Sequence, residues 1–83
     1  MSELSVAVIS PEQTVYEGTA KSVIAPAFDG EVGILPGHAP MLTLLGEGVL
    51  RIGEGTRINV KGGFLQVADN VVRVVTEQAV AAV

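Results

Sequence analysis

Apolar and polar residues alternate in short runs along most of this chain, and the alternation predicts β-strands. In residues 4–9, Leu4, Val6 and Val8 alternate with small or polar residues, which is the two-residue period of a half-buried strand. Later runs repeat the pattern between glycines. In these later runs, the residues expected to point inward are Leu50, Ile52, Ile58, Val60, Leu65, Val67, Val72 and Val74. The pattern therefore indicates short antiparallel strands, each with one buried face.

Glycine, proline, aspartate and asparagine divide these runs and predict the turns. Turns are expected at Glu17-Gly18-Thr19, Asp29-Gly30, Lys61-Gly62-Gly63 and Asp69-Asn70. Prolines on both sides of His38 predict a stiff loop with this histidine near its tip. The C-terminal Q-A-V-A-A-V run contains helix formers for only about two turns, too few for an independent helix. We therefore predict an all-β fold, a flattened β-sandwich of about ten short antiparallel strands.

The same alternation leaves apolar residues on outward positions. Val49, Phe64, Val71 and Val75 are expected to point outward, and Met41, Thr43 and Leu45 do likewise if Leu42 and Leu44 point inward. Small monomeric proteins seldom expose a large contiguous apolar area unless a partner covers it. This pattern favours a docking face; the alternative is that curved sheets bury part of the set.

Length and charge exclude several classes of protein. A chain of 83 residues forms one domain, residues 1–83, and the absence of cysteine removes disulfides and thiolate metal sites. A net charge of −4 with only five Lys and Arg residues argues against nucleic acid and anionic lipid as partners. No apolar run approaches the roughly 20 residues that cross a bilayer. The N-terminal M-S-E-L-S lacks the basic residues of a secretory signal, so we expect no signal peptide.

Candidate chemistry is sparse. His38 is the only histidine, and without cysteine it lacks companions for a zinc site or a recognisable catalytic pair. The G-E-G segments at 46–48 and 53–55 precede no helix and carry an acid, so they indicate turns and not a phosphate cradle. Lys61, expected at a hairpin tip, leaves open a biotinyl or lipoyl carrier domain, although V-K-G-G departs from the usual Met-Lys-Met. We expect no catalytic residue, no cofactor and no metal.

Three blocks of sequence resemble a known family. D-G-E-V-G-I-L-P-G-H-A-P-M-L-T at 29–43, V-K-G-G-F-L-Q-V at 60–67 and N-V-V-R-V-V-T-E-Q-A at 70–79 are similar, in this order, to the N-terminal domain of the epsilon subunit of F-type ATP synthases, called delta in mitochondria. The similarity runs from about Leu4 to Ala79. It implies the same flattened sandwich and a non-catalytic rotor subunit of the central stalk. Such a subunit couples the gamma subunit to the membrane c-ring, so that proton- or ion-driven rotation drives ATP synthesis.

The resemblance also implies contact residues. The acidic position matching Glu31 faces the polar loops of the c-ring, so Asp29 and Glu31 are expected c-ring contacts. The loop and strand that follow lie in the region contacting gamma, and the residues carried over are His38, Ala39, Pro40, Met41 and Thr43. Without the resemblance, the two acids would be interpreted as solvated and His38 as bonded to the backbone.

The resemblance implies a location as well, on the cytoplasmic face of the bacterial inner membrane or the equivalent side of an organellar membrane. The subunit is expected to be a monomer within its complex. In many bacteria the family carries a C-terminal helical hairpin that inhibits ATP hydrolysis and sometimes binds ATP. The sequence stops at Val83, so we expect neither property of this chain; the sequence leaves open whether it is a natural short form.

Overall fold

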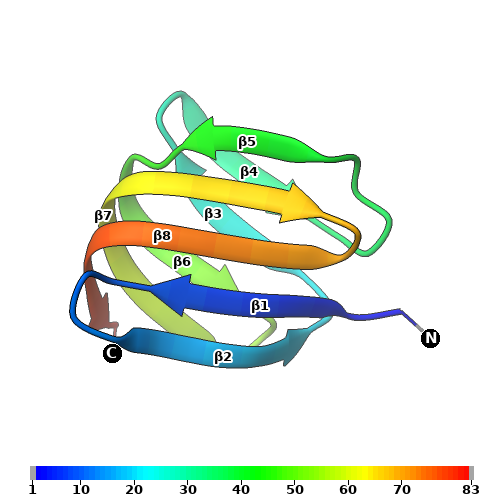
Figure 1. The fold of residues 1–83 in the computed structure, drawn as a ribbon, viewed down its shortest axis with the longest axis horizontal. Helices are drawn as coiled ribbons and strands as arrows, with labels where there is room; N and C mark the ends of the chain where they lie inside the picture. Colours follow the sequence, from blue (N-terminus) through cyan, green and yellow to red (C-terminus); the bar gives the residue numbers. More distant parts are fainter. Residues whose placement is uncertain (1, 83) are drawn as a thin grey trace.

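The computed structural model describes residues 2–82, which form eight strands and no helix. The strands are β1 (Leu4–Ile9), β2 (Thr14–Ala20), β3 (Val23–Ala27), β4 (Gly30–Ile34), β5 (Met41–Leu44), β6 (Glu47–Ile52), β7 (Thr56–Ala68) and β8 (Val71–Ala81). Their hydrogen-bonded order is β2-β1-β8-β7-β6-β3-β4, and β5 pairs with β7. Only β1 and β8 are parallel. The predicted all-β sandwich is confirmed: in Figure 1 a front layer of β2, β1, β8, β7 and β5 covers β6, β3 and β4.

Strand β7 belongs to both layers. Its first half pairs with β6 and its second half with β5, while β8 follows it along nearly its whole length. The strand bends at Gly62 and Gly63, where φ is 71° and 100°. The predicted turn at Lys61-Gly62-Gly63 is therefore wrong, because these glycines bend a continuous strand from one layer to the other. For the same reason eight strands, two of them long, replace the expected ten or so.

The turn predicted at Glu17-Gly18-Thr19 is also wrong, since these residues lie inside β2. β2 pairs with β1 from Leu4↔Ala20 to Ile9↔Thr14, and only after Ala20 does the chain leave the front layer for β3 in the other layer. Gly18 has a packing role: a Cβ there would lie 3.0 Å from the Tyr16 hydroxyl. From the sequence alone, a glycine that makes room for an aromatic ring within a strand cannot be distinguished from a glycine that forms a turn.

The core follows the predicted alternation. Every residue expected to point inward from the later runs is buried, as are Leu4, Val6 and Val8 in β1. Thr76 is the buried polar residue among 2–82, and its hydroxyl donates to the Gln78 carbonyl at 2.9 Å with the Lys61 carbonyl 3.2 Å away. The buried Thr76 hydroxyl therefore has a hydrogen-bond partner at the point where β8 crosses between the layers.

The facing predicted for β5 is wrong. Leu42 and Leu44 are 70% and 62% exposed, whereas Leu45 is buried and Met41 packs against the core. The register explains the reversal, because Met41 lies opposite Val67 and Thr43 opposite Leu65 on β7. Directly opposite residues share a face, and both β7 partners point into the core. Pairing with β7 therefore turns the leucines of β5 outward.

Candidate functional site

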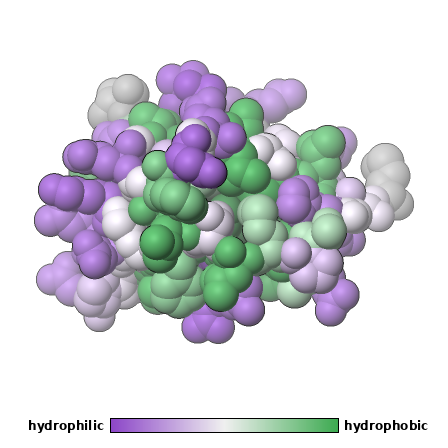
Figure 2. Space-filling view, turned by 90° about the horizontal axis from the view of Figure 1, so that it is seen from above, coloured by the Kyte–Doolittle hydropathy of each residue, from purple (hydrophilic) through white to green (hydrophobic). Residues whose placement is uncertain are grey.

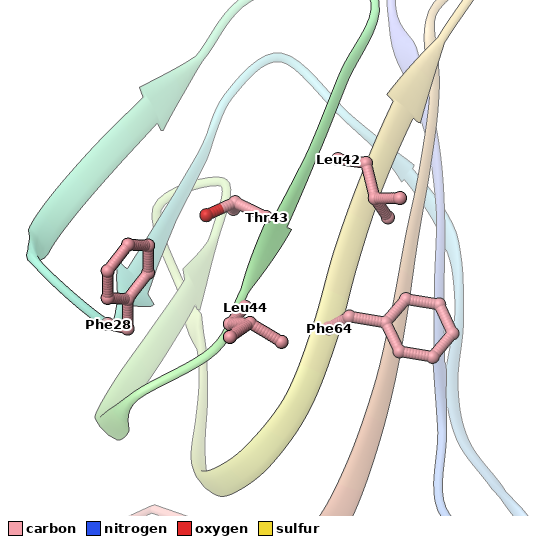
Figure 3. A pocket seen from close by; sticks show the side chains of 5 residues that line it. All are labelled: Phe28, Leu42, Thr43, Leu44 and Phe64. Atoms are coloured by element: carbon pink, nitrogen blue, oxygen red, sulfur yellow. The ribbon is translucent and has the colours of Figure 1, made fainter.

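An exposed apolar surface surrounds β5. Phe28, Leu42, Leu44 and Phe64 are exposed, and with Thr43 they line a shallow hollow of about 490 Å³. We call these residues the β5 patch. Figure 2, which looks onto the side where β4 and β5 lie, shows apolar side chains gathered in its middle with polar ones around them. In Figure 3, Leu42 and Phe64 project to the same side of β5, and Thr43 turns toward Phe28.

Backbone hydrogen bonds fix the patch in place. Phe28 lies in the two-residue turn between β3 and β4, and its amide donates to the Leu44 carbonyl at 3.1 Å. The Gly46 amide donates to the Pro26 carbonyl at 2.8 Å, and the Leu45 amide to the Gly63 carbonyl at 3.0 Å. The turn, the end of β5 and the bend of β7 are thus tied together, so the apolar side chains stand on rigid backbone.

The apolar surface continues across the outer face of the front layer. Leu44 lies opposite Phe64, Phe64 opposite Val75, and Val75 opposite Ile9. These residues form one row across β5, β7, β8 and β1. Phe64 is 40% exposed and Val75 is half-buried in this row. Val49, also predicted to point outward, lies on a different surface. It is opposite Asn59, in the part of β7 that pairs with β6.

The predicted c-ring contacts lie beside one end of the patch. Asp29 follows Phe28 in the β3–β4 turn, and Glu31 is opposite Pro26 at the start of β4; both acids are exposed. An exposed position is what a contact residue requires, and it is also what a solvated acid shows. Their role as contacts stays a prediction.

The predicted gamma contacts divide into two groups. His38, Ala39 and Pro40 lie in the loop after β4, whereas Met41 and Thr43 belong to β5. β4 lies between the two acids and this loop, which begins roughly 13 Å along the strand from Glu31. Asp29 and the 35–40 loop therefore lie at opposite ends of β4. Of the predicted gamma contacts, Thr43 is the one that lines the patch.

Hydrogen bonds hold the 35–40 loop rigid. The His38 amide donates to the Leu35 carbonyl at 3.1 Å around Pro36-Gly37, and the His38 Nδ1 donates to the Ala39 carbonyl at 2.7 Å. The Gly37 amide donates to the Asn70 side-chain oxygen at 2.7 Å, which ties the loop to the β7–β8 turn. The sequence predicts Asn70 only as a turn residue, because its hydrogen bond to the distant Gly37 has no signature in the sequence.

The alternative of a carrier domain depended on Lys61 at a hairpin tip, and that placement is wrong. Lys61 lies within β7, opposite Glu47 on one side and Gln78 on the other. Residues 2–82 contain no group of three or more His, Cys, Asp or Glu side chains suited to a metal ion. They also contain no helix that could span a membrane. The β5 patch is an exposed apolar surface, and apolar contact is the chemistry that it can offer to another molecule.

Comparisons with known sequences identify the family. Residues 3–82 match the family described as ATP synthase, Delta/Epsilon chain, beta-sandwich domain. The sequence is 46% identical over 78 residues to the ATP synthase epsilon chain of Leptospira borgpetersenii, covering 90% of this chain and 61% of that protein. It is 47% identical over 79 residues to that of Synechococcus elongatus, covering 92% and 58%. The chain therefore spans about three fifths of the length of these relatives.

Solved structures have the same fold. A chain of the Euglena gracilis mitochondrial ATP synthase superposes with a TM-score of 0.88 at 22% identity, covering 98% of this chain and 54% of that one. A chain in the central stalk and c-ring structure of the Tetrahymena thermophila mitochondrial ATP synthase gives 0.77 at 18% identity, covering 95% and 66%. Because the family match extends over residues 3–82 and the observed sandwich agrees with it, this chain belongs to the family of ATP synthase delta/epsilon-chain β-sandwich domains.

Proposed function

We propose that this chain is a non-catalytic subunit of the central stalk of an F-type ATP synthase. It holds the gamma subunit against the c-ring, so that rotation of the ring is transmitted to the catalytic head. The membership of the family supports the proposal, and relatives at 46–47% identity are ATP synthase epsilon chains. In this role the chain is peripheral to the membrane, on the side where the catalytic head lies.

The observation that carries the proposal is the β5 patch. Leu42, Leu44 and Phe28 are each more than 60% exposed although the core has enough apolar residues without them. Apolar area of this kind on a small protein is typical of a surface that a partner covers. The gamma subunit is the proposed partner of the patch and of the row that continues from it through Val75.

Replacement of Leu44 by aspartate tests this interface. We expect the affinity for the gamma subunit of the same organism to fall at least about tenfold, because an apolar residue central to an interface can contribute about 2 kcal/mol. Val80→Asp is the matched control, since Val80 is 65% exposed against 62% for Leu44 but lies opposite Asn59 on the other layer. Calorimetric titration measures both affinities. Equal binding by the two variants would contradict the proposal, and so would no wild-type binding at micromolar concentration.

The c-ring proposal concerns the two acids at the end of the patch. Asp29 and Glu31 are exposed beside the β3–β4 turn, and in this proposal they meet polar loops of the ring. An exposed ion pair contributes only about 0.2–1 kcal/mol, so these acids set orientation while apolar burial on gamma provides most of the affinity.

Glu31→Lys should weaken attachment of the catalytic head to membrane vesicles, by about 1 kcal/mol or less per ion pair. The thermal midpoint should stay unchanged, because Glu31 is exposed and makes no packing contribution to the core. Glu54→Lys, an exposed acid in the β6–β7 turn, is the control. The fraction of head retained on vesicles at low and moderate salt measures the effect. A large fall in midpoint with attachment intact would show that Glu31 is a structural residue.

A further inference from the structure

Among residues 2–82, Arg73 is the one basic side chain on the outer face of the front layer. Arg73 on β8 is exposed, with Val71 and Val75 beside it on the same strand and the same face. The residues directly opposite are Gln66 on β7 and Ala7 on β1. Its immediate neighbours in the sheet are therefore all uncharged, and it lies next to the row of Leu44, Phe64, Val75 and Ile9.

The other basic residues lie elsewhere. Of the five Lys and Arg residues, Arg51, Arg57 and Lys61 belong to the strand pair β6–β7, and Lys21 follows β2 in the turn before β3. The nearest acid in the register of Arg73 is Glu17, which lies opposite Ala7 on edge strand β2. Two strand spacings separate it from Arg73, roughly 10 Å between backbones. No cross-strand neighbour of Arg73 thus supplies a negative charge.

A partner that covers the apolar row must also cover Arg73. Removing a guanidinium from water without a counter-charge strongly opposes binding, and apolar contacts around it do not compensate. A carboxylate restores the balance, because the planar guanidinium donates two parallel hydrogen bonds to its oxygens. The surface that docks here must therefore present an aspartate or glutamate at the position facing β8.

We propose that Arg73 determines the specificity and register of this docking face by pairing with a carboxylate of the gamma subunit. This inference rests on the proposed function, and it adds the charge that the partner surface must carry. The paired groups become buried between the row and Val71, so a partner lacking the acid, or docked one strand away, leaves the guanidinium unpaired. The apolar row contributes most of the affinity but does not fix how the two surfaces are aligned. The Arg73–carboxylate pair fixes that alignment.

The test compares three variants for binding to the gamma subunit of the same organism. Arg73→Glu should lower affinity at least about tenfold, and Arg73→Met should also lower it, because each leaves the carboxylate of gamma buried without its partner. Arg57→Glu, the same charge reversal at an exposed residue that pairs with β6, should leave affinity unchanged. Thermal midpoints check that every variant is folded. Replacing the responsible acid of gamma by lysine should restore binding of Arg73→Glu alone.

The outcomes separate the inference from the proposed function. If wild type binds gamma and Arg73→Met binds equally or more tightly, the arginine contributes only its aliphatic stem and the inference is overturned while the proposed function stands. An equal loss for Arg57→Glu and Arg73→Glu would indicate a general effect of net charge, and would also overturn it. Absence of wild-type binding would overturn the proposed function together with the inference.

Discussion

Val72→Asp is expected to unfold the domain. Val72 has no exposed surface and lies in β8 opposite Val67 on β7 and Val6 on β1, so the new carboxylate would be surrounded by buried apolar side chains. Burying an unpaired charge or an unbonded polar group costs several kcal/mol, whereas a domain of this size is stabilised by only about 3–5 kcal/mol. Far-ultraviolet circular dichroism at 25 °C should show loss of the strand signal.

Val71→Asp provides the matched control for this prediction. Val71 is the preceding residue of the same strand but is 49% exposed on the outer face. The same substitution there should cost about 1 kcal/mol or less, mainly through the lower β propensity of aspartate. Unfolding of both variants alike would mean that β8 does not have one buried and one exposed face, which would contradict the described fold.

Gly63→Ala is expected to destabilise the domain by more than about 3 kcal/mol, because strained backbone and steric overlap act together. Gly63 has φ of 100°, a region that residues with a side chain rarely adopt. A Cβ at this position would also collide with the backbone carbonyl of Val75 on the paired strand. Relief requires β7 and β8 to separate where both cross between the layers. Urea unfolding followed by fluorescence of an extrinsic dye or by circular dichroism measures the loss.

Gly55→Ala is the control for the bend. Gly55 lies in the β6–β7 turn, and a Cβ there would meet nothing within 4 Å. The stability of this variant should match or slightly exceed that of the wild type, because alanine reduces the entropy of the unfolded chain. If Gly63→Ala proved as stable as Gly55→Ala, the bend of β7 could not depend on glycine.

In the proposed function the domain must not deform under load, and the buried core of β8 and the bend of β7 provide this rigidity. The bend at Gly63 makes one strand serve both layers, so the β5 side and the β6 side of the sandwich move as one body. The Leu45 amide donates to the Gly63 carbonyl, which connects the patch to this bend. A substitution that destabilises this bend should therefore lower both gamma binding and stability. Leu44→Asp, at an exposed residue, should lower gamma binding alone.

The sequence by itself determined the fold class, the core and part of the turns. Alternation identified the buried residues from Leu50 to Val74 correctly, because residues two positions apart face the same side of a strand and in these runs only one side is strongly apolar. Asp69-Asn70 turns the chain as predicted, with φ of 51° and 63°, whereas the turn predicted at Asp29-Gly30 lies one residue earlier, at Phe28-Asp29, and Gly30 begins β4. These features are local, so a local pattern is enough to predict them.

The tertiary structure decided which apolar residues form the exposed β5 patch. In 41–45, apolar residues stand on both faces of the segment, so either facing satisfies the pattern, and only pairing with buried Leu65 and Val67 turns Leu42 and Leu44 outward. Gly62 and Gly63 could form a turn or a bend, and only the pairing of β7 with both β6 and β5 selects the bend. The patch unites Phe28, residues 42–44 and Phe64, which are far apart along the chain. Contacts of this kind arise from closing two layers on one core, and alternation within a strand carries no information about them.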